Sequence, residues 1–169
     1  MLTPIRLQQV WDVLDSVPDP EIPVVSIHEL GILRDVREDD EGLEIVITPT
    51  YSGCPAMGQI TDDIHAALAQ QQLSARITTQ LAPAWTTDWI SAATKEKLRS
   101  YGIAPPHTTT PGSDKVIRFA ARKTAVDAVA CPQCGSVNST ETSHFGSTAC
   151  KALYKCLDCL EPFDYFKSY

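Results

Sequence analysis

The sequence lacks any long hydrophobic run and is poor in positive charge. Its apolar runs are a few residues long, far short of the roughly 18 residues that a membrane-spanning helix needs. Lys and Arg number 14 against 21 Asp and Glu, which gives a net charge of −7. Such a surface repels phosphate backbones and anionic lipids, so neither nucleic-acid nor membrane binding is expected. The segment from Met1 to Arg6 lacks the apolar core of a secretory signal, and we expect a cytoplasmic protein.

Several catalytic motifs are absent as well. There is no Gly-x-Gly-x-x-Gly loop and no P-loop, and a single Glu-x-x-His, Glu141 to His144, is not the pair of such motifs that a di-iron site uses, so no flavin, nucleotide or di-iron site is indicated. With 43% hydrophobic and 21% charged residues, the composition is typical of a globular protein. Because a reducing cytoplasm disfavours disulfides, the six cysteines are expected to be metal ligands or reactive thiols.

A segment rich in Pro, Thr and Gly divides the chain. It runs from Gly102 to Asp114 and has neither a helical nor a strand period. The sequence therefore predicts a first domain over residues 1–103, a linker over 104–115 and a second domain over 116–169. Cys54 lies in the first domain and the other five cysteines lie in the second.

The first domain has the pattern of a small α+β fold. Its apolar residues predict, in order, a helix around 7–14 that ends before Pro18, strands at 32–36 and 43–47 joined by an acidic turn, a helix from Pro55 to Leu68, a strand at 77–81 and a helix at 89–100. Alternation at Leu43, Ile45 and Ile47 indicates a half-buried strand. These elements predict helices layered on a short mixed sheet.

The second domain combines short β-prone runs, at 116–119, 152–154 and 163–166, with two Cys-x-x-Cys pairs. The pairs are Cys131/Cys134 and Cys156/Cys159, separated by 21 residues that are expected to hold a hairpin. Two such pairs suit one tetrahedral ion, and Gly135 suits the tight turn after the first pair. A structural zinc is the preferred interpretation, and rubredoxin-like iron or an Fe–S cluster stays open. A closed four-thiolate zinc site catalyses nothing.

Cys150 is the unpaired cysteine of the second domain. We expect it to lie outside the metal shell, most simply as a small buried side chain. A thiol that faces a partner and a transient cluster ligand are the alternatives.

Cys54 ends the segment Thr48-Pro-Thr-Tyr-Ser-Gly-Cys54, which follows a strand and opens a helix. A thiol at a helix N-terminus is expected to have a lowered pKa. A structural cysteine, a soft-metal ligand and a nucleophile served by His28 and Glu29 are the three hypotheses for it. Asp19 lies in a proline-rich loop, where it is expected to cap backbone N–H groups.

The loops around Asp19 and Cys54 resemble those of the small α/β family that includes SufT, whose members act in Fe–S protein maturation. A longer resemblance, to the PaaD family of bacterial phenylacetate degradation, covers nearly the whole chain. It is carried by both cysteine pairs and by the segments Pro83–Trp89, Tyr101–Pro106, Phe145–Tyr154 and Glu161–Phe166. The implied fold is a SufT-like α+β domain followed by a four-cysteine zinc ribbon.

The resemblance also implies a function. The chain would be a non-catalytic accessory factor that matures the Fe–S or di-iron components of the phenylacetyl-CoA 1,2-epoxidase, with reductase or oxygenase subunits as clients. Asp19 and Cys54 match the family's functional residues and would carry a transient Fe–S cluster, whereas the four ribbon cysteines would hold zinc. The alternative is a rubredoxin-like electron-transfer component of the same system. A homodimer stays open.

Overall fold

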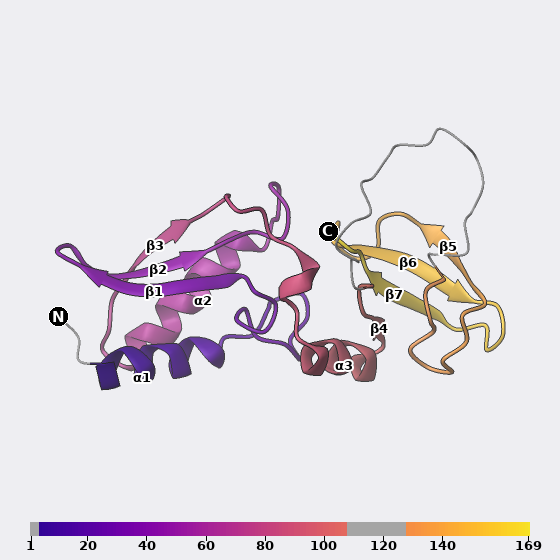
Figure 1. Ribbon diagram of the computed structural model, residues 1–169, viewed down its shortest axis with the longest axis horizontal. Coiled ribbons are helices and arrows are strands. Elements are labelled where there is room, and N and C mark those ends of the chain that lie inside the picture. Colours follow the sequence, from indigo (N-terminus) through magenta and orange to yellow (C-terminus); the bar gives the residue numbers. More distant parts are fainter. Residues whose placement is uncertain (1–3, 108–127) are drawn as a thin grey trace. The chain divides into compact units, whose positions relative to one another are not determined.

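The computed structural model describes residues 4–107 and 128–169 (Figure 1). The chain forms two compact units, one of residues up to Lys97 together with Tyr169, and one from Leu98 to Ser168. The predicted strand at 116–119 and most of the predicted linker lie outside the described residues. No helix in the described parts of the chain is both long enough and apolar enough to cross a bilayer.

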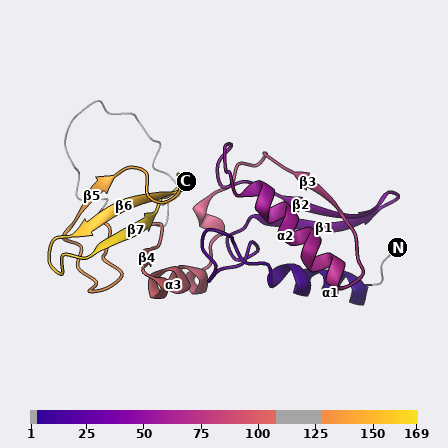
Figure 2. The same ribbon diagram turned by 180° about the vertical axis from the view of Figure 1, so that it is seen from behind.

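The first unit is a three-stranded sheet with helices on it. It contains α1 (Pro4–Asp15), β1 (Leu33–Asp39), β2 (Gly42–Ile47), α2 (Met57–Gln70), β3 (Arg76–Thr79), the 3₁₀ helix η1 (Thr87–Trp89) and most of α3 (Ala92–Tyr101). The strand order is β1-β2-β3, with β1 and β2 antiparallel and β2 and β3 parallel. Helix α2 lies on the face of the sheet that Figure 2 turns toward the viewer. The predicted α+β class is confirmed.

Two predicted elements differ from the structure. Strand β2 is not half-buried, because its residues from Leu43 to Ile47 are buried on both faces of the sheet, and even Val46 is only 2% exposed. The helix predicted over 89–100 is divided: Trp89 ends the 3₁₀ helix η1, and α3 begins at Ala92. The Ser91 hydroxyl caps the start of α3 by accepting a hydrogen bond from Thr94 N at 3.1 Å. Its predicted end is confirmed, since Gly102 follows α3 with a φ of +97°.

Gly31 and Trp89 lie where two distant segments of the first unit pack closely against each other. Gly31 has a φ of +73°, and a Cβ there would lie 3.1 Å from the Cβ of Trp89. The indole of Trp85 donates to the Leu30 carbonyl at 2.9 Å, and the Arg34 guanidinium lies 3.6 Å from the centre of the Trp89 ring. The loop before β1 is therefore fixed by the segment after β3.

The second unit is a four-stranded sheet in the order β4-β7-β6-β5. Its strands are β4 (Ile103–Ala104), β5 (Ser139–Ser143), β6 (Lys151–Cys156) and β7 (Pro162–Phe166). Strands β5 and β6 form the hairpin that was expected between the cysteine pairs. Because β4 pairs with β7, residues 103 and 104 are part of this sheet, and the boundary placed after residue 103 stays a prediction.

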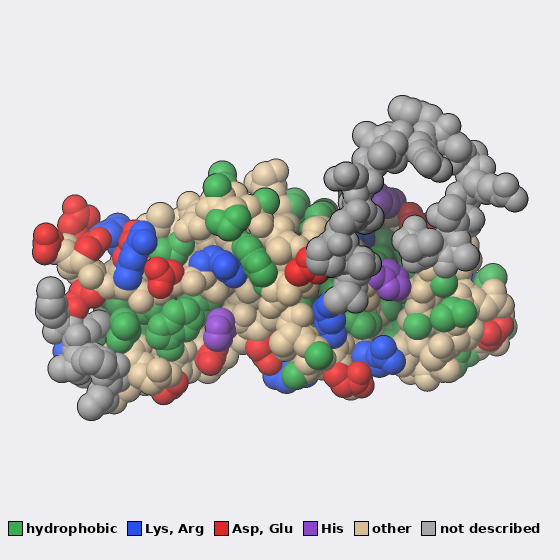
Figure 3. Space-filling model, viewed as in Figure 1, with side chains coloured by type: hydrophobic (Ala, Val, Ile, Leu, Met, Phe, Trp, Pro, Cys, Tyr) green, Lys and Arg blue, Asp and Glu red, His purple; other side chains and the backbone are tan. Residues whose placement is uncertain are grey.

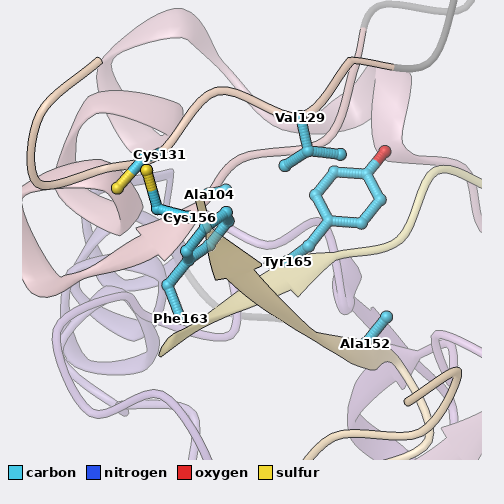
Figure 4. Close-up of a cluster of buried hydrophobic side chains, with 7 residues drawn as sticks. All are labelled: Ala104, Val129, Cys131, Ala152, Cys156, Phe163 and Tyr165. Atoms are coloured by element: carbon cyan, nitrogen blue, oxygen red, sulfur yellow. The ribbon is translucent and has the colours of Figure 1, made fainter. Parts of the chain in front are cut away.

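The core of the second unit is small. Among the described residues, one cluster of it consists of seven buried residues, shown in Figure 4: Ala104, Val129, Cys131, Ala152, Cys156, Phe163 and Tyr165. Two of these are ribbon cysteines, so the core is continuous with the metal-binding side chains. A core of this size stabilises a domain only weakly and benefits from a metal.

Candidate functional site

The four ribbon cysteines come together at one end of the second unit. Cys131 and Cys134 precede β5, Cys156 ends β6, and Cys159 lies in the turn before β7. Their sulfur atoms all lie within 4.8 Å of one another. Cys131 and Cys156 are buried, whereas Cys134 and Cys159 reach the surface.

The spacing of these sulfurs fits a single tetrahedral ion. Thiolates at about 2.3 Å from a zinc ion would be separated by about 3.8 Å. The Cys131 and Cys159 sulfurs lie 3.7 Å apart, and those of Cys134 and Cys156 lie 3.6 Å apart. A cluster of several irons would spread its thiolates over different metal ions and separate them further. The geometry therefore supports one closed, four-thiolate ion.

Each cysteine pair is followed by a residue with positive φ. Gly135 has a φ of +75° and donates its N–H to the Cys131 carbonyl at 2.9 Å. Leu160 takes the corresponding place after Cys159 with a φ of +67°. In the second pair, Cys159 N donates to the Cys156 sulfur at 3.5 Å. The two turns therefore share a positive φ at the residue that follows the second cysteine, although only the first turn has the glycine that such a φ favours.

Asp158 ties the two cysteine turns together. Its carboxylate accepts hydrogen bonds from the Ser136 hydroxyl and, at 2.7 Å, from the Asn138 amide. These two bonds lower the pKa of Asp158, so the carboxylate is ionised at neutral pH. These two hydrogen bonds therefore link the first turn to the second.

Two of the ribbon thiols, those of Cys156 and Cys159, have pKa values that are shifted in opposite directions. The N–H of Cys159 lowers the pKa of Cys156 to about 7. For Cys159, the N–H of Glu161 stabilises the thiolate, but burial and the three neighbouring thiols together outweigh it and raise the pKa to about 12. Metal binding must therefore displace protons from this site, and metal affinity increases with pH.

Cys150 lies outside this shell, as predicted. It is buried, and its sulfur is 3.0 Å from the Thr148 hydroxyl. The next residue, Lys151, is buried as well, and its ammonium lies 3.6 Å from the Asp164 carboxylate. Cys150 is thus part of the packed interior beside a buried ion pair.

Cys54 lies in the loop between β2 and α2, with an intermediate exposure. Burial is the main cause of a raised pKa, and the Glu21 and Asp19 carboxylates raise it further, against hydrogen bonds from Ala56 N and the Thr50 hydroxyl. The expected lowering of the pKa is therefore wrong. Helix α2 begins only at Met57, three residues beyond the thiol, and burial of the thiol opposes its ionisation.

Asp19 is buried and fixed by its own loop. Its Oδ1 accepts hydrogen bonds from Glu21 N at 2.9 Å and from Ile22 N at 2.8 Å, which confirms the expected capping role. The loop brings both Asp19 and Glu21 close enough to Cys54 to affect its pKa. Glu21 was not among the predicted site residues, although its position two residues after Asp19 was a usable signal.

His28 and Glu29 have other partners. The His28 ring contacts the Asp15 carboxylate and lies 5.3 Å from the Trp11 ring. Glu29 accepts hydrogen bonds from Ser26 N at 3.0 Å and from Lys97 at 2.5 Å. None of these contacts involves Cys54, so the hypothesis of a cysteine nucleophile served by these two residues gains no support.

Within residues 4–107 and 128–169, the ribbon cysteines are the one group of three or more potential ligand atoms that lie within 4.8 Å of one another. Cys54 and Asp19 therefore do not form a preassembled three-ligand metal site.

Separate family models match the part of the chain that contains Cys54 and the part that contains the ribbon cysteines. Residues 7–78 match the family model described as iron-sulfur cluster assembly protein, and residues 118–167 match the PaaD zinc beta ribbon domain. An Escherichia coli protein described as a putative subunit of the 1,2-phenylacetyl-CoA epoxidase is 44% identical over 98% of this chain and 95% of its own length. The chain belongs to the PaaD family.

Two further relatives each match little more than half of this chain. The Fe-S protein maturation auxiliary factor YitW of Bacillus subtilis is 34% identical over 56% of this chain and 86% of its own length. A solved structure from Bacillus anthracis, described as a domain of unknown function DUF59, is 29% identical over 54% of this chain and 90% of its own, with a TM-score of 0.50. The PaaD-family chain therefore joins this fold to a zinc ribbon.

Proposed function

We propose that this PaaD-family protein is an accessory factor that matures the iron-containing components of the phenylacetyl-CoA 1,2-epoxidase. The observation that carries the proposal is the match of residues 7–78 to an iron-sulfur cluster assembly family, because that region contains Asp19, Glu21 and Cys54. The similarity of the whole chain to the Escherichia coli epoxidase protein supports the choice of system. The clients would be the Fe–S reductase or the oxygenase subunits.

The surroundings of Cys54 suit a carrier better than a permanent metal site. A raised pKa means that the thiol must lose a proton before its sulfur binds iron, which weakens binding near neutral pH. Because Cys54 belongs to no group of three potential ligand atoms in the described part of the chain, a cluster bound as cargo would keep coordination positions for a client's cysteines. Weak binding and open positions both favour release.

The ribbon has a different role in this proposal. Cys131, Cys134, Cys156 and Cys159 would hold a structural zinc, which supplies folding free energy and no chemistry. A mononuclear iron in the same shell would instead favour the electron-transfer alternative, since the sulfur spacing suits either ion. The two functions differ in whether the protein is needed during turnover.

The test compares Cys54→Ser with Cys150→Ser, a control at a thiol outside both sites. Cells with Cys54→Ser are expected to make a reductase that is low in iron and sulfide, whereas Cys150→Ser leaves both contents unchanged. Matured reductase and oxygenase should turn over equally well with or without this protein. If turnover by matured components requires it stoichiometrically, the maturation proposal is wrong and the protein transfers electrons.

A further inference from the structure

Three exposed apolar side chains surround the cysteine turns of the ribbon. Val137, Leu157 and Leu160, here called the knuckle patch, are 62%, 48% and 62% exposed. Leu157 N donates to the Asn138 carbonyl at 2.8 Å, which places it beside Val137, and Leu160 follows in the same turn. Hydrophobic side chains are exposed on the ribbon in Figure 3 as well. Clustered exposed apolar residues often mark interaction sites.

Leu160 is the most informative member of the knuckle patch. Its φ of +67° is a conformation that costs free energy for any residue with a Cβ, and Gly135 avoids this cost at the corresponding place in the other turn. With 62% of the residue exposed, packing within the ribbon offsets little of that cost. Strained residues that persist in this way are often found at functional sites.

The border of the knuckle patch is negatively charged. Asp158 lies between Leu157 and Leu160, and Glu161 follows Leu160. The zinc-bound shell would add a net charge of about −2, since four thiolates surround one divalent ion, and two of its sulfurs belong to surface residues. Lys155 is the nearest cation along the chain. An apolar centre with an acidic border is complementary to an apolar groove bordered by Lys or Arg.

We propose that the knuckle patch is the docking surface for a client protein, with Leu160 as the anchor in an apolar groove bordered by basic side chains. The choice of client, the Fe–S reductase of the epoxidase system, rests on the proposed function. The zinc then holds the docking surface in shape, while Cys54 on the first unit handles the cargo. An acidic border disfavours nucleic acid as the occupant.

The decisive variant is Leu160→Gly, because docking through Leu160 predicts a weaker affinity for the reductase even though the ribbon becomes more stable. A leucine with only a structural role predicts an unchanged affinity. Glycine relieves the positive-φ strain, so the zinc-loaded ribbon should melt at a higher temperature. Binding to purified reductase, measured by calorimetry, should weaken about 10- to 30-fold, as for loss of an interface anchor. Leu81→Ser is the matched control, since Leu81 is 66% exposed on the first unit. It should leave the affinity unchanged.

Other outcomes overturn the docking proposal. Unchanged affinity of Leu160→Gly for the reductase would do so, and so would failure of the wild-type protein to bind the reductase. If sedimentation shows a wild-type dimer that Leu160→Gly dissociates, the patch joins two copies of this chain instead. Cys54→Ser should bind the reductase normally but fail to mature it. This result would show that docking and maturation are separate properties of the protein. Normal maturation by Cys54→Ser would refute the proposed function and leave the docking proposal standing.

Discussion

At the scale of single residues, Cys54 is a thiol whose surroundings oppose ionisation. Burial and the carboxylates of Glu21 and Asp19 act in the same direction and raise its pKa. A protonated thiol reacts slowly with electrophiles, so the residue is protected from adventitious oxidation until a metal displaces its proton. This property suits a cargo ligand better than a nucleophile.

Glu21→Gln is expected to increase the reactivity of Cys54. Removing one neighbouring negative charge lowers the pKa of the thiol, so a larger fraction is thiolate at a given pH. The measurement is the rate of iodoacetamide alkylation of Cys54 at pH 8, followed by mass spectrometry on zinc-loaded protein. Glu38→Gln, on strand β1, is the control and should leave the rate unchanged. Equal rates for both variants would show that Glu21 does not act on the thiol.

At the scale of elements, Glu44 links the three strands of the first sheet. It is a buried residue of β2, and its carboxylate accepts hydrogen bonds from Thr78 at 2.7 Å, from Arg37 on β1 at 2.5 Å and from Arg76 on β3 at 3.3 Å. Thr78, followed by the two arginines, lowers the pKa of Glu44 to about 2. A carboxylate satisfied in this way belongs to the sheet and not to a binding site.

The lowered pKa of Glu44 predicts a pH dependence of stability. Its stabilising effect is present above the ordinary pKa of 4.5 and is lost as the pH falls from 4.5 toward 2, because the unfolded chain takes up the proton first. The melting temperature of the first unit should therefore drop over this range. Glu44→Gln should melt lower at pH 7 and show a smaller further drop, as measured by circular dichroism. An unchanged pH profile in the variant would contradict this assignment.

The cysteine turns are a second element with a definite prediction. Cys134→Ser should abolish stoichiometric zinc binding and unfold the ribbon, since metal binding and folding are coupled in so small a core. Zinc content by elemental analysis and the amide spectrum of the ribbon are the measurements. Cys150→Ser should keep one zinc per chain. If Cys150→Ser lost the metal while Cys134→Ser kept it, the ligand assignment would be wrong.

At the scale of the whole molecule, the first unit is expected to fold without the ribbon. A fragment of residues 1–102 keeps α3 and the glycine that follows it, and it omits β4, which pairs with β7 of the other unit. The solved Bacillus anthracis chain, 90% of which matches this part, supports independent folding. The fragment should show one cooperative thermal transition in calorimetry. A molten or aggregating fragment would mean that the two units share a core.

The sequence by itself determined the features that depend on local spacing. The clustering of four cysteines followed from two Cys-x-x-Cys pairs, and the hairpin followed from the gap between them. The end of α3 followed from Gly102, and the capping role of Asp19 followed from its proline-rich loop. Each depends on residues a few positions apart, so backbone geometry over a short range was sufficient.

Only the tertiary structure decided features that depend on distant segments. The burial of β2 on both faces depends on side chains from other segments, such as those of Arg37 and Arg76 over Glu44, and no local pattern encodes that neighbourhood. The raised pKa of Cys54 comes first from burial and then from the carboxylates of Glu21 and Asp19, which lie in a loop more than thirty residues upstream. The positive φ of exposed Leu160 likewise becomes visible only in the folded second cysteine turn. Burial and electrostatics are sums over spatial neighbours, and these are set by the fold.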